Sequence, residues 1–164
     1  MQGLVCAMAI LKRSTKIKVM FVDEMNDLQS QVAEFFLNDM FGGVYEAYSA
    51  GPKWDCIDVE LISSMYQNGY DIRACNAKDF KAKELPKKLD YIVFLEQATY
   101  DRIKDVIPWD AKQIVKDFGR KTGFDKATDD LELFQCYTKL IEDVRNWVGD
   151  TFKDPDSLDE LVVQ

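Results

Sequence analysis

The sequence predicts an α/β fold: a doubly wound, four-stranded parallel sheet in the order 2-1-3-4, with helices on both faces in a three-layer arrangement. Short β-rich apolar runs alternate with segments whose apolar residues recur at helical spacing. One run, residues 89–95, is apolar almost throughout, as expected for a strand covered on both faces. The chain has 164 residues and 47% hydrophobic content, enough to bury one sizeable core.

The first strand, helix and second strand occupy residues 16–49. Residues 16–22, KIKVMFV, form a β-rich run that ends abruptly in polar residues, which is typical of a buried strand. The next segment predicts a helix closed by the glycine pair at 42–43, and residues 44–49 predict a short second strand. The apolar positions of this helix are Leu28, Val32, Phe35, Phe36 and Met40.

The remaining elements continue the alternation. Apolar residues between 59 and 66 predict a second helix, stopped by a left-handed cap at Asn68-Gly69. Residues 89–95 predict the third strand, residues 99–106 a helix ended by Pro108, and residues 113–115 a short fourth strand. A long amphipathic helix over 131–148 completes the fold.

Composition excludes several classes of function. The chain carries 21 Lys+Arg against 29 Asp+Glu, a net charge of −8, which disfavours nucleic acid and anionic membrane as partners. It contains no histidine, which removes histidine acid/base catalysis and nearly every common zinc site. The four cysteines lie far apart with no C-x-x-C pair, a pattern that favours a reduced, cytoplasmic protein.

The two ends of the chain differ from its middle. Residues 1–15 predict an N-terminal extension, because the basic residues follow the short apolar run and a secretory signal has the opposite order. Residues 16–149 predict the folded domain. Residues 150–164 contain five acids and one lysine, and we expect them to form a loosely held acidic C-terminal tail.

The turn from the first strand into the first helix, residues 23–30, is the place where a sheet of this class holds an anion. The loop and its surroundings carry several short motifs in a definite order: VMFV at 19–22, Asn26, SQVAE at 30–34, SAG at 49–51, Asp71-Ile72 and Leu89-Asp90-Tyr91. These motifs resemble the low-molecular-weight protein tyrosine phosphatase and arsenate reductase family, in which an apolar strand runs into Cys, five residues, then Arg-Ser. The resemblance covers roughly residues 16–148.

The resemblance implies a phosphotyrosine phosphatase I-like domain that has lost its chemistry. The family's nucleophilic cysteine falls on Asp23 and its phosphate-binding arginine on Gln29, so neither thiolate attack nor a guanidinium clamp is expected. The family's Asp-Pro acid is missing, and Asp117 is a poor match for it. Residues 96–101 lack the redox cysteines of arsenate reductases.

Other positions of the loop are retained or altered. Asn26 and Ser30 match family residues that shape the phosphate loop, whereas a family glycine falls on Met25, which would be strained if that position needs a positive φ. Asp23, Glu24 and Asp27 place carboxylates where the family holds phosphate. Two unit charges about 4 Å apart repel by ~4 kcal/mol at an effective dielectric of 20, so we expect phosphate binding to be disfavoured.

Three functions remain, and the first is a non-enzymatic interaction or regulatory module with an unidentified protein partner, a homodimer being left open. The second is a Mg²⁺ or Ca²⁺ site formed by Asp23, Glu24 and Glu96, since the first and third strands are neighbours in this order. The third is altered phosphatase chemistry with Asp23 as nucleophile, although Met25 removes the second acid of an Asp-x-Asp pair. Trp54 is a candidate aromatic wall of the pocket.

Overall fold

The computed structural model describes residues 15–164, so the predicted extension over 1–15 lies outside the described residues except for its last position. Strands and helices alternate along the chain, and the four parallel strands take the order β2-β1-β3-β4, which confirms the predicted fold class. The elements are β1 Ile17–Val22, α2 Gln29–Phe41, β2 Tyr45–Ala50, α3 Val59–Gln67, β3 Tyr91–Phe94, α4 Gln97–Ile103, β4 Lys112–Val115, η1 Phe124–Lys126, α5 Asp130–Phe152 and η2 Pro155–Leu161.

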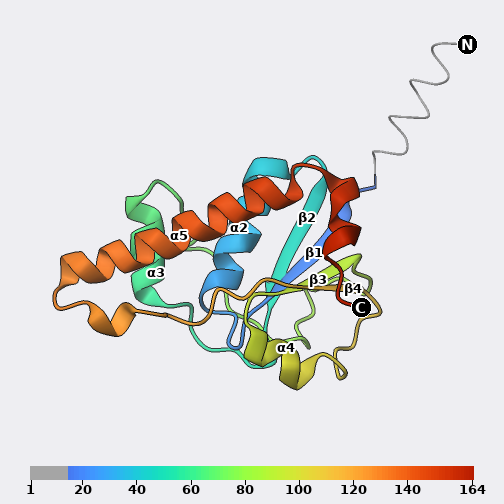
Figure 1. Ribbon diagram of the computed structural model, residues 1–164, viewed down its shortest axis with the longest axis horizontal. Coiled ribbons are helices and arrows are strands. Elements are labelled where there is room, and N and C mark those ends of the chain that lie inside the picture. The colour runs from blue at the N-terminus through green and yellow to red at the C-terminus, as the bar shows by residue number, and fades with distance from the viewer. Residues whose placement is uncertain (1–14) are drawn as a thin grey trace, which may run out of the picture.

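The sheet is packed on both faces. Val19 and Phe21 of β1 belong to a large apolar cluster with α2, α3 and α5, whereas Met20 and Val22 belong to a smaller cluster with β3 and α4. This alternation follows from the two-residue period of a strand. In Figure 1 the helices α2, α3 and α5 lie on one side of the sheet and α4 on the other.

Several predicted elements have bounds that differ from the structure by a few residues. The third strand begins at Tyr91, and just before it the Asp90 carboxylate accepts a hydrogen bond from the backbone N–H of Lys18 at 2.8 Å. The helix predicted to end before Pro108 already ends at Ile103. The predicted cap after α3 is confirmed, since Gly69 has a φ of +92°.

Residues 150–164 were expected to be a loose tail, and this expectation is wrong. Helix α5 continues through Phe152, which is buried, and η2 places the buried side chain of Leu158 against the main core. Val162 then forms an antiparallel bridge with Ile114 of β4, and the N–H of Val163 donates to the carbonyl of Gln113 at 2.8 Å. The segment therefore covers the outer edge of the sheet. Within residues 15–164 no helix has both the length and the apolar content needed to cross a bilayer.

Candidate functional site

The loop between β1 and α2 lies at the carboxyl edge of the sheet, with Glu96 following β3 beside it. The side chains at the two key positions of the family resemblance, Asp23 and Gln29, are completely buried, and so are Asn26 and Ser30. A residue that attacks a substrate must be reached by it. The structure therefore shows a filled loop and not an open crevice at this position.

The Asp23 carboxylate occupies the centre of the loop. It accepts hydrogen bonds from the backbone N–H groups of Ser30 at 2.8 Å, Leu28 at 3.3 Å and Asp27 at 3.3 Å. These are the amides that a bound anion would use at the start of a helix. Burial raises the pKa of Asp23, and the hydrogen bonds from Ser30 oppose that shift. The loop amides are thus satisfied by a side chain of the loop itself.

Asn26 and Ser30 lie together and join the loop to its neighbours. The Asn26 Nδ2 donates to Ser30 Oγ at 3.0 Å, and the Asn26 Oδ1 accepts from the backbone N–H of Lys78 at 2.9 Å. Within residues 15–164 the non-glycine residues with positive φ are Asn26, at 51°, and Lys121, at 53°. Met25 is not among them, so the expected strain does not arise at Met25 and the left-handed position of the loop belongs to Asn26, a residue type that tolerates it.

The segment after β2 packs tightly on the loop. The backbone N–H of Lys53 donates to the carbonyl of Glu24, and that of Asp58 donates to the carbonyl of Asp27. A Cβ at Gly51 would lie 2.5 Å from the carbonyl oxygen of Asp23, so only glycine permits this approach. Trp54 is carried by the same segment, and its side chain is 60% exposed.

Gln29 points to the segment that follows β4. Its Nε2 donates to the carbonyl of Gly119 at 2.6 Å, and its Oε1 is buried without a hydrogen-bond partner in the described residues. Asp117, the poor match for the family's acid, is exposed and accepts hydrogen bonds from the backbone N–H groups of Gly119, at 2.8 Å, and Gln97, at 3.2 Å. Asp117 therefore shapes its own turn and the start of α4.

Arg120 closes the site from the same segment. Its guanidinium binds both carboxylate oxygens of Asp27, at 2.7 and 2.8 Å, and lies 3.4 Å from Glu96 Oε1. Burial raises the pKa of Glu96, while the hydrogen bond from the Glu24 N–H opposes the shift. Sequence reasoning missed Arg120, because it lies 93 residues from its main partner and no local pattern marks such a pair.

Glu24 is also paired. It accepts hydrogen bonds from Thr99 Oγ1, at 2.9 Å, and from Arg102. These bonds outweigh the effect of burial and lower the pKa of Glu24. Arg102 and Arg120 therefore pair with three of the carboxylates at this edge of the sheet, which makes the site less acidic than the sequence alone indicates.

The Mg²⁺ or Ca²⁺ site predicted at Asp23, Glu24 and Glu96 is not formed by these side chains in the described residues. Within the part of the chain that the structure describes, no group of three His, Cys, Asp or Glu side chains could hold a metal ion. Asp23 is directed to the loop amides, and Glu24 and Glu96 are directed to arginines. Carboxylates with these partners do not converge as the ligands of a Mg²⁺ or Ca²⁺ ion would.

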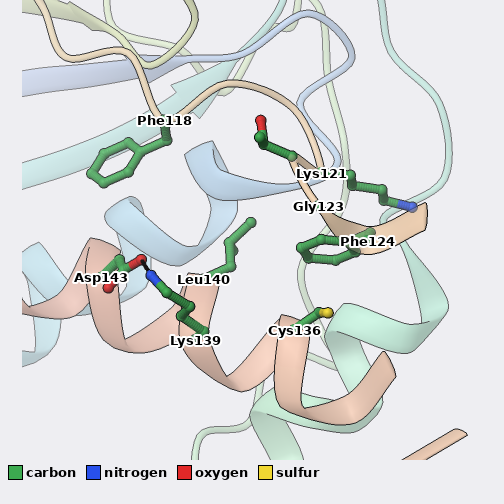
Figure 2. Close-up of a pocket in the computed structure, with 9 residues that line it drawn as sticks. Phe118, Lys121, Gly123, Phe124, Cys136, Lys139, Leu140 and Asp143 are labelled. Carbon is green, nitrogen blue, oxygen red and sulfur yellow. Dashed lines mark hydrogen bonds and ion pairs between the residues drawn. The ribbon is translucent and has the colours of Figure 1, made fainter. Parts of the chain in front are cut away.

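Residues 118–124, which carry Arg120, are called the closing segment. A cavity of about 420 Å³ lies between this segment and α5. Figure 2 shows Phe118, Phe124 and Leu140 around this space, with Cys136 at the α5 side. At its rim the Lys121 Nζ lies 2.6 Å from Asp58 Oδ2, which also accepts a hydrogen bond from the Tyr137 hydroxyl at 2.7 Å. The closing segment is thus fixed on both sides of Arg120.

The chain was compared with protein-family profiles, curated sequences and solved structures. A family profile described as low molecular weight phosphotyrosine protein phosphatase matches residues 18–149. Among curated protein sequences, none matches the chain. Solved structures do match in fold. The low molecular weight protein tyrosine phosphatase of T. tengcongensis aligns with a TM-score of 0.63 at 19% identity, over 82% of this chain and 96% of that one.

Two further structures match at similar levels. A low molecular weight phosphotyrosine phosphatase of Vibrio cholerae O395 aligns with a TM-score of 0.63 at 17% identity, over 85% of this chain and 98% of that one. A thioredoxin-dependent arsenate reductase of Corynebacterium glutamicum aligns with a TM-score of 0.59 at 18% identity, over 85% of this chain and 62% of that one. At such identities the likeness establishes the fold alone.

Proposed function

This chain belongs to the low molecular weight phosphotyrosine protein phosphatase family, and we propose that it is a catalytically inactive member with a protein-interaction or regulatory role. One observation carries the proposal. The fully buried Asp23 carboxylate accepts the hydrogen bonds of the loop amides. A phosphoryl group would have to displace a covalently attached carboxyl group from the amides to which its own oxygens would bind.

Two neighbouring side chains support the same conclusion. Gln29 carries no charge and its amide donates to Gly119, so the loop lacks a cation for a phosphoryl group at this position. Arg120 could supply a charge, but it is already bound to Asp27 and Glu96. Altered chemistry with Asp23 as nucleophile is disfavoured by the same burial, because an attacking oxygen must meet its substrate.

The interaction role rests on the segment that follows β2. Trp54 and Val59 are 60% and 72% exposed, and the backbone of residues 53–58 is hydrogen-bonded to the closed loop. Large apolar side chains that are exposed on a fixed backbone suit a protein partner. We propose that this segment contacts the partner, with a second copy of the chain as one candidate.

The decisive experiment is hydrolysis of an aryl phosphate by the purified chain, with Asp23→Asn prepared in parallel. We expect both proteins to match the buffer blank. Turnover above the blank that disappears in Asp23→Asn would overturn the proposal, and equal turnover in both would identify a contaminant. Inorganic phosphate should leave the melting temperature unchanged, because the loop amides have no vacancy for it.

A second experiment tests how the site was lost. The double variant Asp23→Cys with Gln29→Arg restores the family's nucleophilic cysteine and its phosphate-binding arginine. We expect it to stay inactive, because the pairs of Arg120 with Asp27 and of Lys121 with Asp58 still hold the segment after β4 in place. Activity in the double variant would show that only these two side chains were lost. For the interaction role, the pair Trp54→Ser and Val59→Ser should abolish partner binding or self-association, whereas Val106→Ser, which changes an equally exposed residue near α4, should not.

A further inference from the structure

The C-terminal segment, residues 150–164, leaves apolar side chains uncovered on the surface of the domain. Leu161 and Val163 are 47% and 40% exposed. They flank Val162, which forms the bridge to β4, and Leu158 of the same segment is buried in the main core. The segment therefore packs on the domain with one set of side chains and offers a second apolar set, Leu161 and Val163, to a further element.

The same segment carries exposed acids that lack a basic partner. Among the residues that the structure describes, Asp154, Asp156 and Glu160 take part in no ion pair. Asp159 is paired, since its carboxylate lies 2.7 Å from Lys112 Nζ. The uncovered apolar side chains thus belong to a segment with negative charge to spare, which favours an occupant that is both apolar and basic.

The chain enters the sheet beside this segment. Ile17, the first residue of β1, pairs with Tyr45 of β2, whose hydroxyl donates to the carbonyl of Phe152 at 2.9 Å. On the other side of β1, the hydroxyl of Tyr91 at the start of β3 donates to Asp159 at 2.7 Å. Figure 1 shows the same arrangement, with the start of β1 next to η2. The residues that precede β1 therefore join the domain next to the C-terminal segment.

These preceding residues have the composition that the surface favours. Residues 3–11, GLVCAMAIL, carry no charged side chain, and Lys12 and Arg13 follow them directly. The four residues after this apolar run, 12–15, cover about 14 Å when extended. Strand β4, to which Val162 is bridged, lies two strand spacings from β1, or about 10 Å. The apolar run therefore reaches the uncovered side chains on either side of Val162.

We propose that residues 3–11 dock on the C-terminal segment of the same molecule and cover Leu161 and Val163. Lys12 and Arg13 then lie beside the acidic side chains of that segment. Burial of apolar surface on both partners drives the contact, and the short connection to β1 keeps the effective concentration of the run high. The charges set the orientation of the run. The contact joins the two ends of the chain across the outer strand of the sheet.

Cys6 lies inside the apolar run and reports on it directly. The test is the rate at which iodoacetamide alkylates each cysteine of the full chain, measured peptide by peptide by mass spectrometry and compared with the rate in urea. We expect the rate of Cys6 to be lower in the native chain than in urea by about tenfold or more, the value for a run that is docked roughly nine tenths of the time. Cys56 is exposed, so it serves as the reference and should react at similar rates in both conditions.

Two substitutions on the C-terminal segment locate the contact. Leu161→Ser with Val163→Ser should raise the rate of Cys6 to its value in urea, because the apolar surface under the run is lost. Val106→Ser is the matched control, since it changes an exposed valine near α4, and it should leave the rate unchanged.

Charge reversal tests the contact while the apolar surface stays intact. Lys12→Glu with Arg13→Glu should raise the rate of Cys6, because the run then meets acids of its own sign. The further changes Asp156→Lys and Glu160→Lys in the same chain should lower the rate again. Such a recovery requires the two ends of the chain to be in contact.

Each result bears on the proposal. A Cys6 that reacts in the native chain as fast as in urea would overturn it, and so would protection that Leu161→Ser with Val163→Ser leaves unchanged. Protection that increases with protein concentration would also overturn it, because the run would then lie on a second copy of the chain. The comparison of native and urea rates on one protein does not depend on how any variant folds.

Discussion

Replacement of Arg120 by Ala tests whether the closing segment is held by its ion pairs. The change leaves Asp27 and Glu96 without the guanidinium that now lies 2.7 and 3.4 Å from them. The Arg120 side chain is 33% exposed, but those of its partners are only 15% and 9% exposed, so the carboxylates remain largely withdrawn from water. Hydrogen bonds to charged groups contribute ~1.5–3 kcal/mol and exposed pairs ~0.2–1 kcal/mol, which places the expected loss near 2 kcal/mol.

The assay is urea unfolding at neutral pH, followed by tryptophan fluorescence and by circular dichroism. In a separate thermal unfolding experiment on a domain of this size, the same loss of about 2 kcal/mol should lower the melting temperature by roughly 4–8 °C. Arg73→Ala is the matched control, because the side chains of Arg73 and its partner Asp71 are 61% and 51% exposed, so water screens this pair and it should contribute little to stability. Equal losses in the two variants would refute the view that Arg120 holds the segment closed.

Three more predictions concern the C-terminal segment, the loop after β1 and the buried carboxyl group of Glu34. Leu158→Ala should cost about 2–5 kcal/mol of the free energy of unfolding, as for other buried leucines, whereas a loose C-terminus would tolerate it; chemical denaturation measures this. Asn26→Gly should have a higher melting temperature than Asn26→Ala, since a φ of 51° strains alanine but not glycine. Both variants should melt below the native protein. Because burial raises the pKa of Glu34 above its ordinary 4.5, its ionisation costs stability as pH rises; Glu34→Gln should gain on the native protein from acidic to neutral pH in melting curves.

The sheet and its helices were predictable because they depend on local periodicity. The run at 89–95 and the helical spacing from Leu28 to Met40 each carry their own signal, and parallel strands with helical crossovers permit few topologies. The C-terminal segment was misjudged because its five acids dominate the composition. Phe152, Leu158 and Val162 are its buried or half-buried anchors, and they follow no regular period.

The candidate site was predictable in position but not in arrangement. The substitutions at Asp23 and Gln29 could be read from the spacing of the loop. The sequence could not show that the Asp23 carboxylate turns inward to the loop amides, because that direction depends on the backbone of residues 24–30. It could not show the pairing of Arg120 with Asp27 either, since the two are joined only by the fold.

The substitutions in the loop are consistent with one another as a set. A loop whose N–H groups converge needs an acceptor, and the Asp23 carboxyl group supplies one that cannot leave. With that acceptor in place, a cation at position 29 has no phosphoryl group to bind, and the uncharged Gln29 amide is free to anchor Gly119. The same anchor brings Arg120 over Asp27, which offsets the charge of that carboxylate. A single reversion at position 23 would therefore leave the closing segment in place, and a regained activity has to begin with its release.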